Sequence, residues 1–144
     1  MMKLVSKTFD QLNAIELYEI LRSRVNVFVV EQNCPYPELD GKDYESLHVF
    51  CEEQGKILAY LRAYIMAPDV VRMGRVLTVS RGTGLGRKLL RHGIQEICEK
   101  FSPKSIYIEA QTYAVGFYER EGFKICSEEF LEDGIPHVKM ELVF

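Results

Sequence analysis

The sequence predicts a single layered domain of the α/β or α+β class, and three observations support this prediction. The chain has 144 residues, which suffice for one domain but are few for two. Hydrophobic residues make up 47% of it and charged residues 27%, as in ordinary globular proteins. Runs with the two-residue period of strands alternate with runs of helical period, and no repeat or low-complexity linker separates them. Residues 1–144 are therefore expected to form one domain.

The first third of the chain is predicted to hold a strand, a helix and an acidic loop. A strand within Lys3–Phe9 precedes a helix over about Gln11–Val27, with Asp10 as the expected N-cap. The residues expected on its buried stripe recur at helical spacing, namely Leu17, Leu21 and Val25, flanked by Tyr18 and Phe28. Two prolines in Asn33–Pro37 end the helix. Glu38–Ser46 is then an acidic loop that could attract a cationic amine, although such charge runs are usually solvated surface.

The middle of the chain has the alternation of strands. Leu47–Glu52 and Ile57–Met66 flank Glu53–Lys56, which predicts a four-residue hairpin turn with a positive φ at its glycine. Val70–Val79 is the third strand of this meander. The remaining expected elements are a helix over Leu85–Phe101, a strand over Ser105–Ala110, a short helix over Val115–Arg120, a strand over Phe123–Phe130, a turn at Asp133-Gly134 and a closing strand over Pro136–Phe144.

Charge and composition exclude several classes of function. The chain has 18 Lys and Arg against 21 Asp and Glu, a net charge of −3, which argues against nucleic-acid binding by bulk electrostatics. No apolar run approaches the roughly 20 residues of a membrane helix, and the N-terminus lacks a signal-peptide pattern. The four cysteines are scattered, and the three histidines are not spaced as a metal set. A cytoplasmic protein without metal is therefore expected.

The most informative segment joins the third meander strand to the strongest helix. It places three alternate glycines, Gly82, Gly84 and Gly86, where backbone N–H groups and the helix N-terminus can hold a phosphate. Arg81, Arg87 and Lys88 add positive charge around them. The spacing fits neither a P-loop nor a dinucleotide fingerprint.

The pattern Arg81-x-x-Gly84-x-Gly86 resembles motif A (R/Q-x-x-G-x-G/A) of the GCN5-related N-acetyltransferases, the GNAT family. Ala110–Phe123 looks like motif B of the same family, with Gln111 in place of the usual Asn. The segments Val27–Tyr36, Asp40–Asp43 and Glu132–Met140 resemble the ElaA-type branch. One departure is the Val79-Ser80-Arg81 link, which is about two residues shorter than in ElaA-type relatives.

The resemblance implies a GNAT fold, a central mixed but mostly antiparallel sheet flanked by helices in the order β-α-α-β-β-β-α-β-α-β-β. It implies acetyl-CoA as acyl donor, a small-molecule or peptide amine as acceptor, and no nucleic acid or membrane as partner. The coenzyme contacts it implies are Leu77, Thr78, Val79, Arg81, Gly82, Thr83, Gly84, Leu85, Gly86, Arg87, Gln111, Phe117 and Tyr118. A homodimer paired through the closing strand is also compatible with the sequence.

Acetyl transfer from a thioester to an amine needs a neutral amine, a stabilised oxyanion and a protonated thiolate. By resemblance, the backbone N–H of Val79 or Leu77 serves the oxyanion and Tyr118 is the general acid. The base is Glu31, Glu109 or a water molecule; Glu31 is preferred because the ElaA-type signature includes it.

The leading interpretation is thus an acetyl-CoA-dependent N-acetyltransferase that uses a ternary complex. A non-catalytic acyl-CoA sensor on the same fold is the alternative. A thiol redox protein built around Cys34, the cysteine expected to be most exposed, is a third and weaker interpretation.

Overall fold

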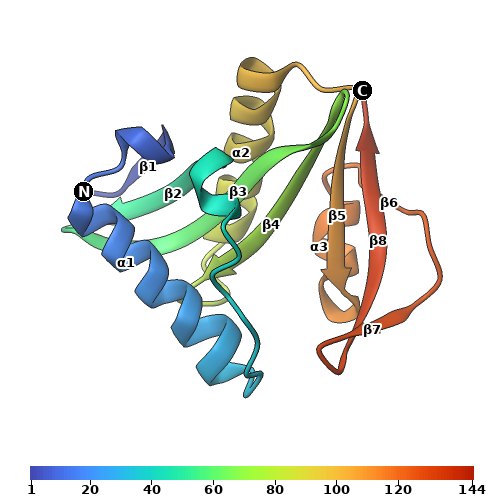
Figure 1. Cartoon of the computed structure of the whole chain (residues 1–144), viewed down its shortest axis with the longest axis horizontal. Coiled ribbons are helices and arrows are strands. Elements are labelled where there is room, and N and C mark those ends of the chain that lie inside the picture. Colours follow the sequence, from blue (N-terminus) through green and yellow to red (C-terminus); the bar gives the residue numbers. More distant parts are fainter.

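The computed structural model describes residues 1–144 and contains one eight-stranded sheet. The strands lie in the order β1-β2-β3-β4-β5-β8-β6, with β7 also paired to β8. Only the β4–β5 pair is parallel, so the mixed, mostly antiparallel sheet is confirmed (Figure 1). The strand bounds are β1 Lys3–Thr8, β2 Leu47–Glu53, β3 Lys56–Ala67, β4 Val70–Thr78, β5 Ser105–Gln111, β6 Lys124–Ile125, β7 Phe130–Glu132 and β8 Ile135–Val143.

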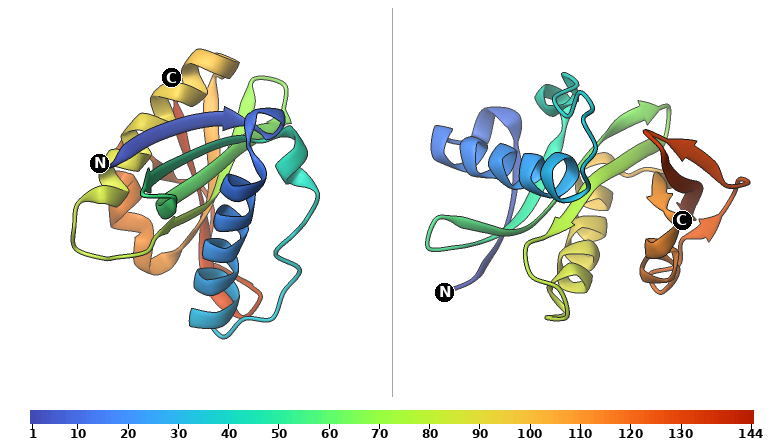
Figure 2. Two further views of the ribbon diagram at one scale, coloured as in Figure 1. Left: turned by 90° about the vertical axis from the view of Figure 1, so that its left-hand side faces the viewer. Right: turned by 90° about the horizontal axis from the view of Figure 1, so that it is seen from below.

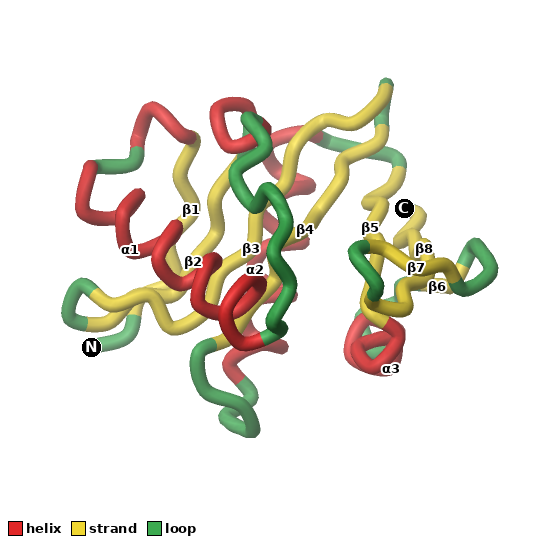
Figure 3. The backbone as a smooth tube through the Cα atoms, turned by 60° about the horizontal axis from the view of Figure 1, so that its bottom comes forward, coloured by secondary structure: helices red, strands yellow, loops and turns green.

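Helices cover both faces of this sheet. On one face lies α1 (Ala14–Arg24), which continues without a break into the π-helical segment η2 (Val25–Glu31). On the other face lie α2 (Leu85–Phe101) and the short α3 (Val115–Glu119), as Figure 2 shows. The tube in Figure 3 shows the long loop that leads from η2 back to the sheet. Three short 3₁₀ turns complete the fold: η1 Phe9–Gln11, η3 Lys42–Glu45 and η4 Thr112–Ala114. None of the helices has both the length and the apolarity that crossing a bilayer requires.

Two hydrophobic clusters hold the helices to the sheet. The larger one lies under α2 and includes Leu61 of β3 and Leu89 of α2. The smaller one lies under α1 and includes Ile20 of α1, Tyr60 of β3 and Leu77 of β4. Leu61 and Tyr60 are adjacent in β3 and point to opposite faces, as the two-residue period of a strand requires.

The first helix begins later than predicted, and a different face of it is buried. Asn13, not Asp10, is the N-cap, and its side chain accepts a hydrogen bond from the Glu16 N–H at 2.8 Å. The buried residues are Glu16, Ile20 and Arg24, whereas the predicted stripe is half-buried or exposed. The apolar pattern gave the wrong face because two ionised side chains are buried through ion pairs, which a hydrophobic stripe does not reveal.

Two further predictions were wrong in detail. The β2–β3 turn has two residues, Gln54 and Gly55, and both have positive φ. The strand predicted over Phe123–Phe130 is two short strands, β6 and β7, at opposite ends of β8. The ladder breaks between them because the Ser127 hydroxyl accepts the Lys139 N–H at 2.9 Å in place of a backbone carbonyl.

The feature that positions the site is the separation of β4 from β5. The two strands pair only over Val70–Arg72 and Ser105–Tyr107, and they diverge beyond these residues (Figure 1). A bulge opposite Leu61 contains Arg75, whose φ of 54° is left-handed, and it turns β4 away from its neighbour. The sheet therefore opens into a wedge at its centre.

Candidate active site

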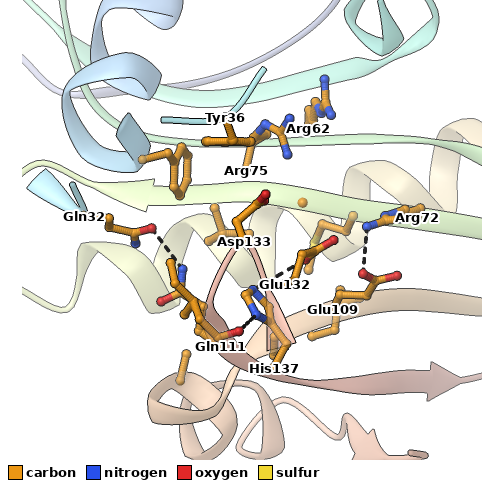
Figure 4. Close-up of a pocket in the computed structure, with 18 of the residues that line it drawn as sticks. Gln32, Tyr36, Arg62, Arg72, Arg75, Glu109, Gln111, Glu132, Asp133 and His137 are labelled. Atoms are coloured by element: carbon orange, nitrogen blue, oxygen red, sulfur yellow. Dashed lines mark hydrogen bonds and ion pairs between the residues drawn. The ribbon is translucent and has the colours of Figure 1, made fainter. Parts of the chain in front are cut away.

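A cleft of about 400 Å³ fills the wedge between β4 and β5. Figure 4 shows its two walls. Tyr36, Arg62 and Arg75 lie on one wall, and Glu109, Glu132 and His137 lie on the other. The cleft is thus formed by the loop after η2, the bulged part of β4, the end of β5 and the β7–β8 hairpin.

The glycine loop lies at the start of α2, and its backbone is shaped for an anion. Gly82 and Gly84 both have φ of 76°, a conformation that favours glycine. The Leu85 N–H donates to the Thr83 hydroxyl at 3.4 Å, and the Lys88 N–H is the first of α2 to reach a backbone carbonyl, that of Gly84 at 3.3 Å. The N–H groups of Gly86 and Arg87 between them are therefore available to a ligand. The side chains of Arg81, Arg87 and Lys88 are exposed beside them.

Gly86 fits this loop closely against its surroundings. A Cβ atom at this position would lie 3.3 Å from Thr78 Cγ2 and 3.5 Å from the Phe117 ring. The glycine therefore lets the N-terminus of α2 approach β4 and α3 together. A second hollow of about 240 Å³ opens beside the loop, where Ser80, Thr83 and Lys88 line it. The structure thus brings the predicted coenzyme contacts of β4, the loop and α3 to one end of the wedge.

The expected oxyanion donors are wrong, because their N–H groups face the neighbouring strand. The Val79 N–H donates to the Leu58 carbonyl at 2.9 Å. Leu77 stands opposite Tyr60 in the same antiparallel ladder, so alternation directs its N–H to β3 as well. The N–H of Thr78, between them, points toward the open side of β4 by the same alternation.

Tyr118 lines the cleft from α3, and its side chain is nearly enclosed, with 8% of the residue exposed. Phe117 and Phe123 pack against its ring edge-on, with centroids 5.1 Å and 5.7 Å away. Its hydroxyl makes no hydrogen bond within the chain. The hydroxyl oxygen is not one of the fully buried atoms that lack a partner, so it faces the cleft. Burial, and next the nearby Tyr113, raise the pKa of Tyr118 well above its ordinary value. The phenol therefore stays protonated at neutral pH and can donate.

The two candidate bases differ in position. Glu31 is exposed at the end of η2 and does not line the cleft. Glu109 lines the cleft, where it accepts the Tyr107 hydroxyl at 2.7 Å and pairs with Arg72 at 3.4 Å. The geometry thus favours Glu109 over the residue that the resemblance preferred.

Glu132 and His137 also line the cleft, and the sequence predicted neither of them as an acid–base group. His137 Nδ1 lies 2.7 Å from the Ile135 carbonyl, and its Nε2 lies 3.6 Å from the Glu132 carboxylate. Burial, and next the charge of Glu109, raise the pKa of Glu132. A sequence signal existed for both, because they belong to the segment that resembles the ElaA-type C-terminus.

The acidic loop is not the free anionic surface that its sequence suggested. Glu38 and Asp43 are buried and pair with Arg24, whose side chain is fully enclosed. Asp40 and Asp43 pair with Arg62, and Glu38 also pairs with Arg75. Three carboxylates and three guanidinium groups thus form one network, which fixes the loop as a rigid cleft wall.

His48 and Cys34 have structural roles. His48 is fully buried between the Tyr60 hydroxyl, at 2.6 Å, and the Asp43 carbonyl, at 2.9 Å. Cys34 is buried rather than exposed, and its Sγ lies 3.7 Å from the Asp133 carbonyl. Cys126 is the exposed thiol, and all four cysteines are unpaired. No group of three or more metal-ligating side chains is present.

Comparison with known proteins agrees with this geometry. Residues 16–144 match the family model described as an acetyltransferase (GNAT) domain. A UPF0039 protein of Schizosaccharomyces pombe is 42% identical over 145 residues, covering 98% of this chain and 97% of that protein. The crystal structure of Escherichia coli ElaA superposes with a TM-score of 0.93 at 31% identity, covering 99% of both chains. That of an acyl-CoA N-acyltransferase from Pseudomonas aeruginosa gives 0.92 at 36% identity, covering 99% of this chain and all of the other. The chain therefore belongs to the GNAT acetyltransferase family and, within it, to the ElaA-type branch.

Proposed function

We propose that this protein is an acetyl-CoA-dependent N-acetyltransferase that acetylates a primary amine in a ternary complex. The observation that carries the proposal is the wedge between β4 and β5. At one end of the wedge lies a glycine loop whose backbone can bind an anion, and at the other end lies a polar cleft. The acyl-CoA N-acyltransferase from Pseudomonas aeruginosa shares this fold over the whole chain, which supports the same reaction class here.

The donor is expected to bind with its pyrophosphate on the glycine loop and its thioester between the strands. The free N–H groups of Gly86 and Arg87 at the start of α2 suit the phosphates, as do the exposed Arg81 and Arg87 side chains. Phe117 packs at the loop, and the adjacent Tyr118 lines the cleft, so α3 spans the distance between the two ends. The sulfur is then expected near the Tyr118 hydroxyl.

The acceptor amine would then attack the thioester carbonyl from the cleft. Its proton passes to Glu109, directly or through water, and the Thr78 N–H stabilises the developing oxyanion. As the carbon–sulfur bond breaks, Tyr118 protonates the departing thiolate. The protein thus orients the amine, accepts one proton from it at Glu109 and donates another to the thiolate from Tyr118. Four unpaired cysteines suit a reducing compartment such as the cytoplasm.

Calorimetric titration of the protein with acetyl-CoA tests the first half of this proposal. We expect saturable binding, and absence of heat at high micromolar coenzyme would overturn it. The second half is tested by following thiol release across a panel of primary amines. Tight coenzyme binding with no amine acetylated would instead identify a non-catalytic acyl-CoA sensor.

A further inference from the structure

We infer that the acceptor binds as a positively charged amine against the Glu109–Glu132 carboxylate pair, opposite the arginine wall of the cleft. We call Glu109, Glu132 and Asp133 the acidic wall. The inference rests on the proposed function and narrows the acceptor to alkylamines that carry a charge before they react.

The arginine wall consists of Arg62 and Arg75, with the enclosed Arg24 behind them, and its positive charge is already neutralised within the chain. Arg24, Arg62 and Arg75 are matched one for one by the three carboxylates of the network described above. These contacts use both oxygens of Glu38 and fix Arg75 over the Tyr36 ring at 5.4 Å. Lys42, which also lines this side of the cleft, pairs with Glu45 at 3.4 Å. An anionic acceptor would have to break these ion pairs, so this wall favours no charged partner.

The acidic wall, in contrast, has unbalanced negative charge. The wall has three carboxylates, and one arginine pairs with them: Arg72, 3.4 Å from Glu109. Lys139 stands opposite Glu109 in the β5–β8 register but forms no ion pair and does not line the cleft. The raised pKa of Glu132 has the same origin, since burial and Glu109 both disfavour a second negative charge there. An ammonium group between the two carboxylates would remove this penalty.

Two other side chains point to a ligand at the same place. The Ile135 carbonyl can only accept, so His137 Nδ1 carries a proton, and in the neutral tautomer that this bond selects the lone pair is on Nε2. That Nε2 has no hydrogen bond, because Glu132 is 3.6 Å away, although 90% of the side chain is buried. Tyr118 is likewise buried, with 8% of the residue exposed, and its hydroxyl has no partner and opens onto the cleft. An amine is a donor that both the Nε2 lone pair and the carboxylates can accept (Figure 4).

The test compares two probes of one shape and different charge. Benzylamine and benzyl alcohol are titrated into the coenzyme A-saturated protein and followed by NMR at about pH 7, where an alkylamine is protonated. We expect benzylamine to bind about tenfold or more tightly than the alcohol, the size of one charge-assisted contact. The measurement needs no turnover, so it is independent of whether acetylation occurs.

Three variants locate the preference. Glu132→Gln and Glu109→Gln should each reduce it several-fold, and the double variant should abolish it. Glu129→Gln is the matched control, because it removes the same charge from an exposed residue outside the cleft. Equal binding of the two probes would overturn the inference, as would a preference that survives in the double variant while its amide spectrum stays folded. Failure of coenzyme A to bind at all would instead overturn the proposed function.

Discussion

Gln111 at the end of β5 donates a hydrogen bond from Nε2 to Oε1 of Gln32, 3.2 Å away and 79 positions earlier in the chain. Both residues line the cleft, and the bond joins its two walls directly after η2 (Figure 4). Gln111 stands where the motif that Ala110–Phe123 resembles has Asn. The longer side chain therefore connects the walls of the wedge in addition to any contact with the coenzyme.

This connection predicts a measurable coupling between the two residues. In a double-mutant cycle of Gln32→Ala and Gln111→Ala, we expect a coupling free energy of about 0.5–1.5 kcal/mol, the usual value of a neutral hydrogen bond. Urea unfolding of the four proteins measures it. Strict additivity of the two substitutions would show that the bond contributes nothing to holding the walls together.

Tyr118→Phe separates a catalytic from a packing role of this residue. The hydroxyl has no partner in the chain and opens onto the cleft, so its removal should leave the unfolding free energy nearly unchanged. Loss of a general acid should lower kcat about 10²-fold while the Kd of acetyl-CoA stays nearly constant. Parallel losses of stability, coenzyme affinity and turnover would point to packing instead.

The loop's role can be tested with two glycines of equal backbone conformation. Gly84 and Gly55 have φ of 76° and 77°, and neither has an atom within 4 Å of a Cβ position. Substitution by alanine should therefore cost each about 1 kcal/mol of strain. Only Gly84→Ala should also weaken acetyl-CoA binding, by about tenfold, because under the proposed function the N–H groups of the loop that contains Gly84 contact the ligand. Equal coenzyme affinity in the two variants would remove the loop from the binding site.

The sequence contained enough to predict the central elements but not the composition of the cleft. The helix over Leu85–Phe101 is confirmed residue for residue, because a glycine-rich start, a strong apolar stripe and Ser102-Pro103 mark its bounds. The face of α1 could not be predicted, since burial of Arg24 depends on Glu38 and Asp43 from a distant loop. Glu109 and Glu132 share a wall only because β5 and β7 both pair with β8. No local periodicity encodes such a juxtaposition.

The buried ion network makes stability depend on acid pH. Burial alone would raise the pKa of Asp43, but the hydrogen bond and charge of Arg24, with those of Arg62, lower it. A carboxylate with a lowered folded-state pKa stabilises the fold above its unfolded pKa of about 3.9 and loses this contribution as pH falls further. We expect the unfolding free energy to decline below about pH 5.

Asp43→Asn should make this decline shallower and lower the stability at neutral pH by about 3 kcal/mol or more, because Arg24 then keeps only part of its compensation. Urea unfolding at a series of pH values measures both effects. An unchanged pH slope would show that other carboxylates dominate acid unfolding.

The contact between α2 and β3 depends on the absence of a side chain at Gly93. A Cβ atom there would lie 2.8 Å from Leu61 Cδ2 and 3.2 Å from its Cδ1, and Leu61 is fully buried. Alanine in a helix interior normally gains up to about 1 kcal/mol over glycine. The overpacked core should outweigh this gain, so Gly93→Ala should destabilise the protein by about 1–3 kcal/mol.

Gly116→Ala in α3 is the control, because no atom lies within 4 Å of its Cβ position, and it should be neutral or stabilising. Adding Leu61→Val to Gly93→Ala should recover part of the loss in thermal unfolding. If Gly93→Ala instead gained stability like the control, the core under α2 would have to be looser than the packing of Leu61 implies.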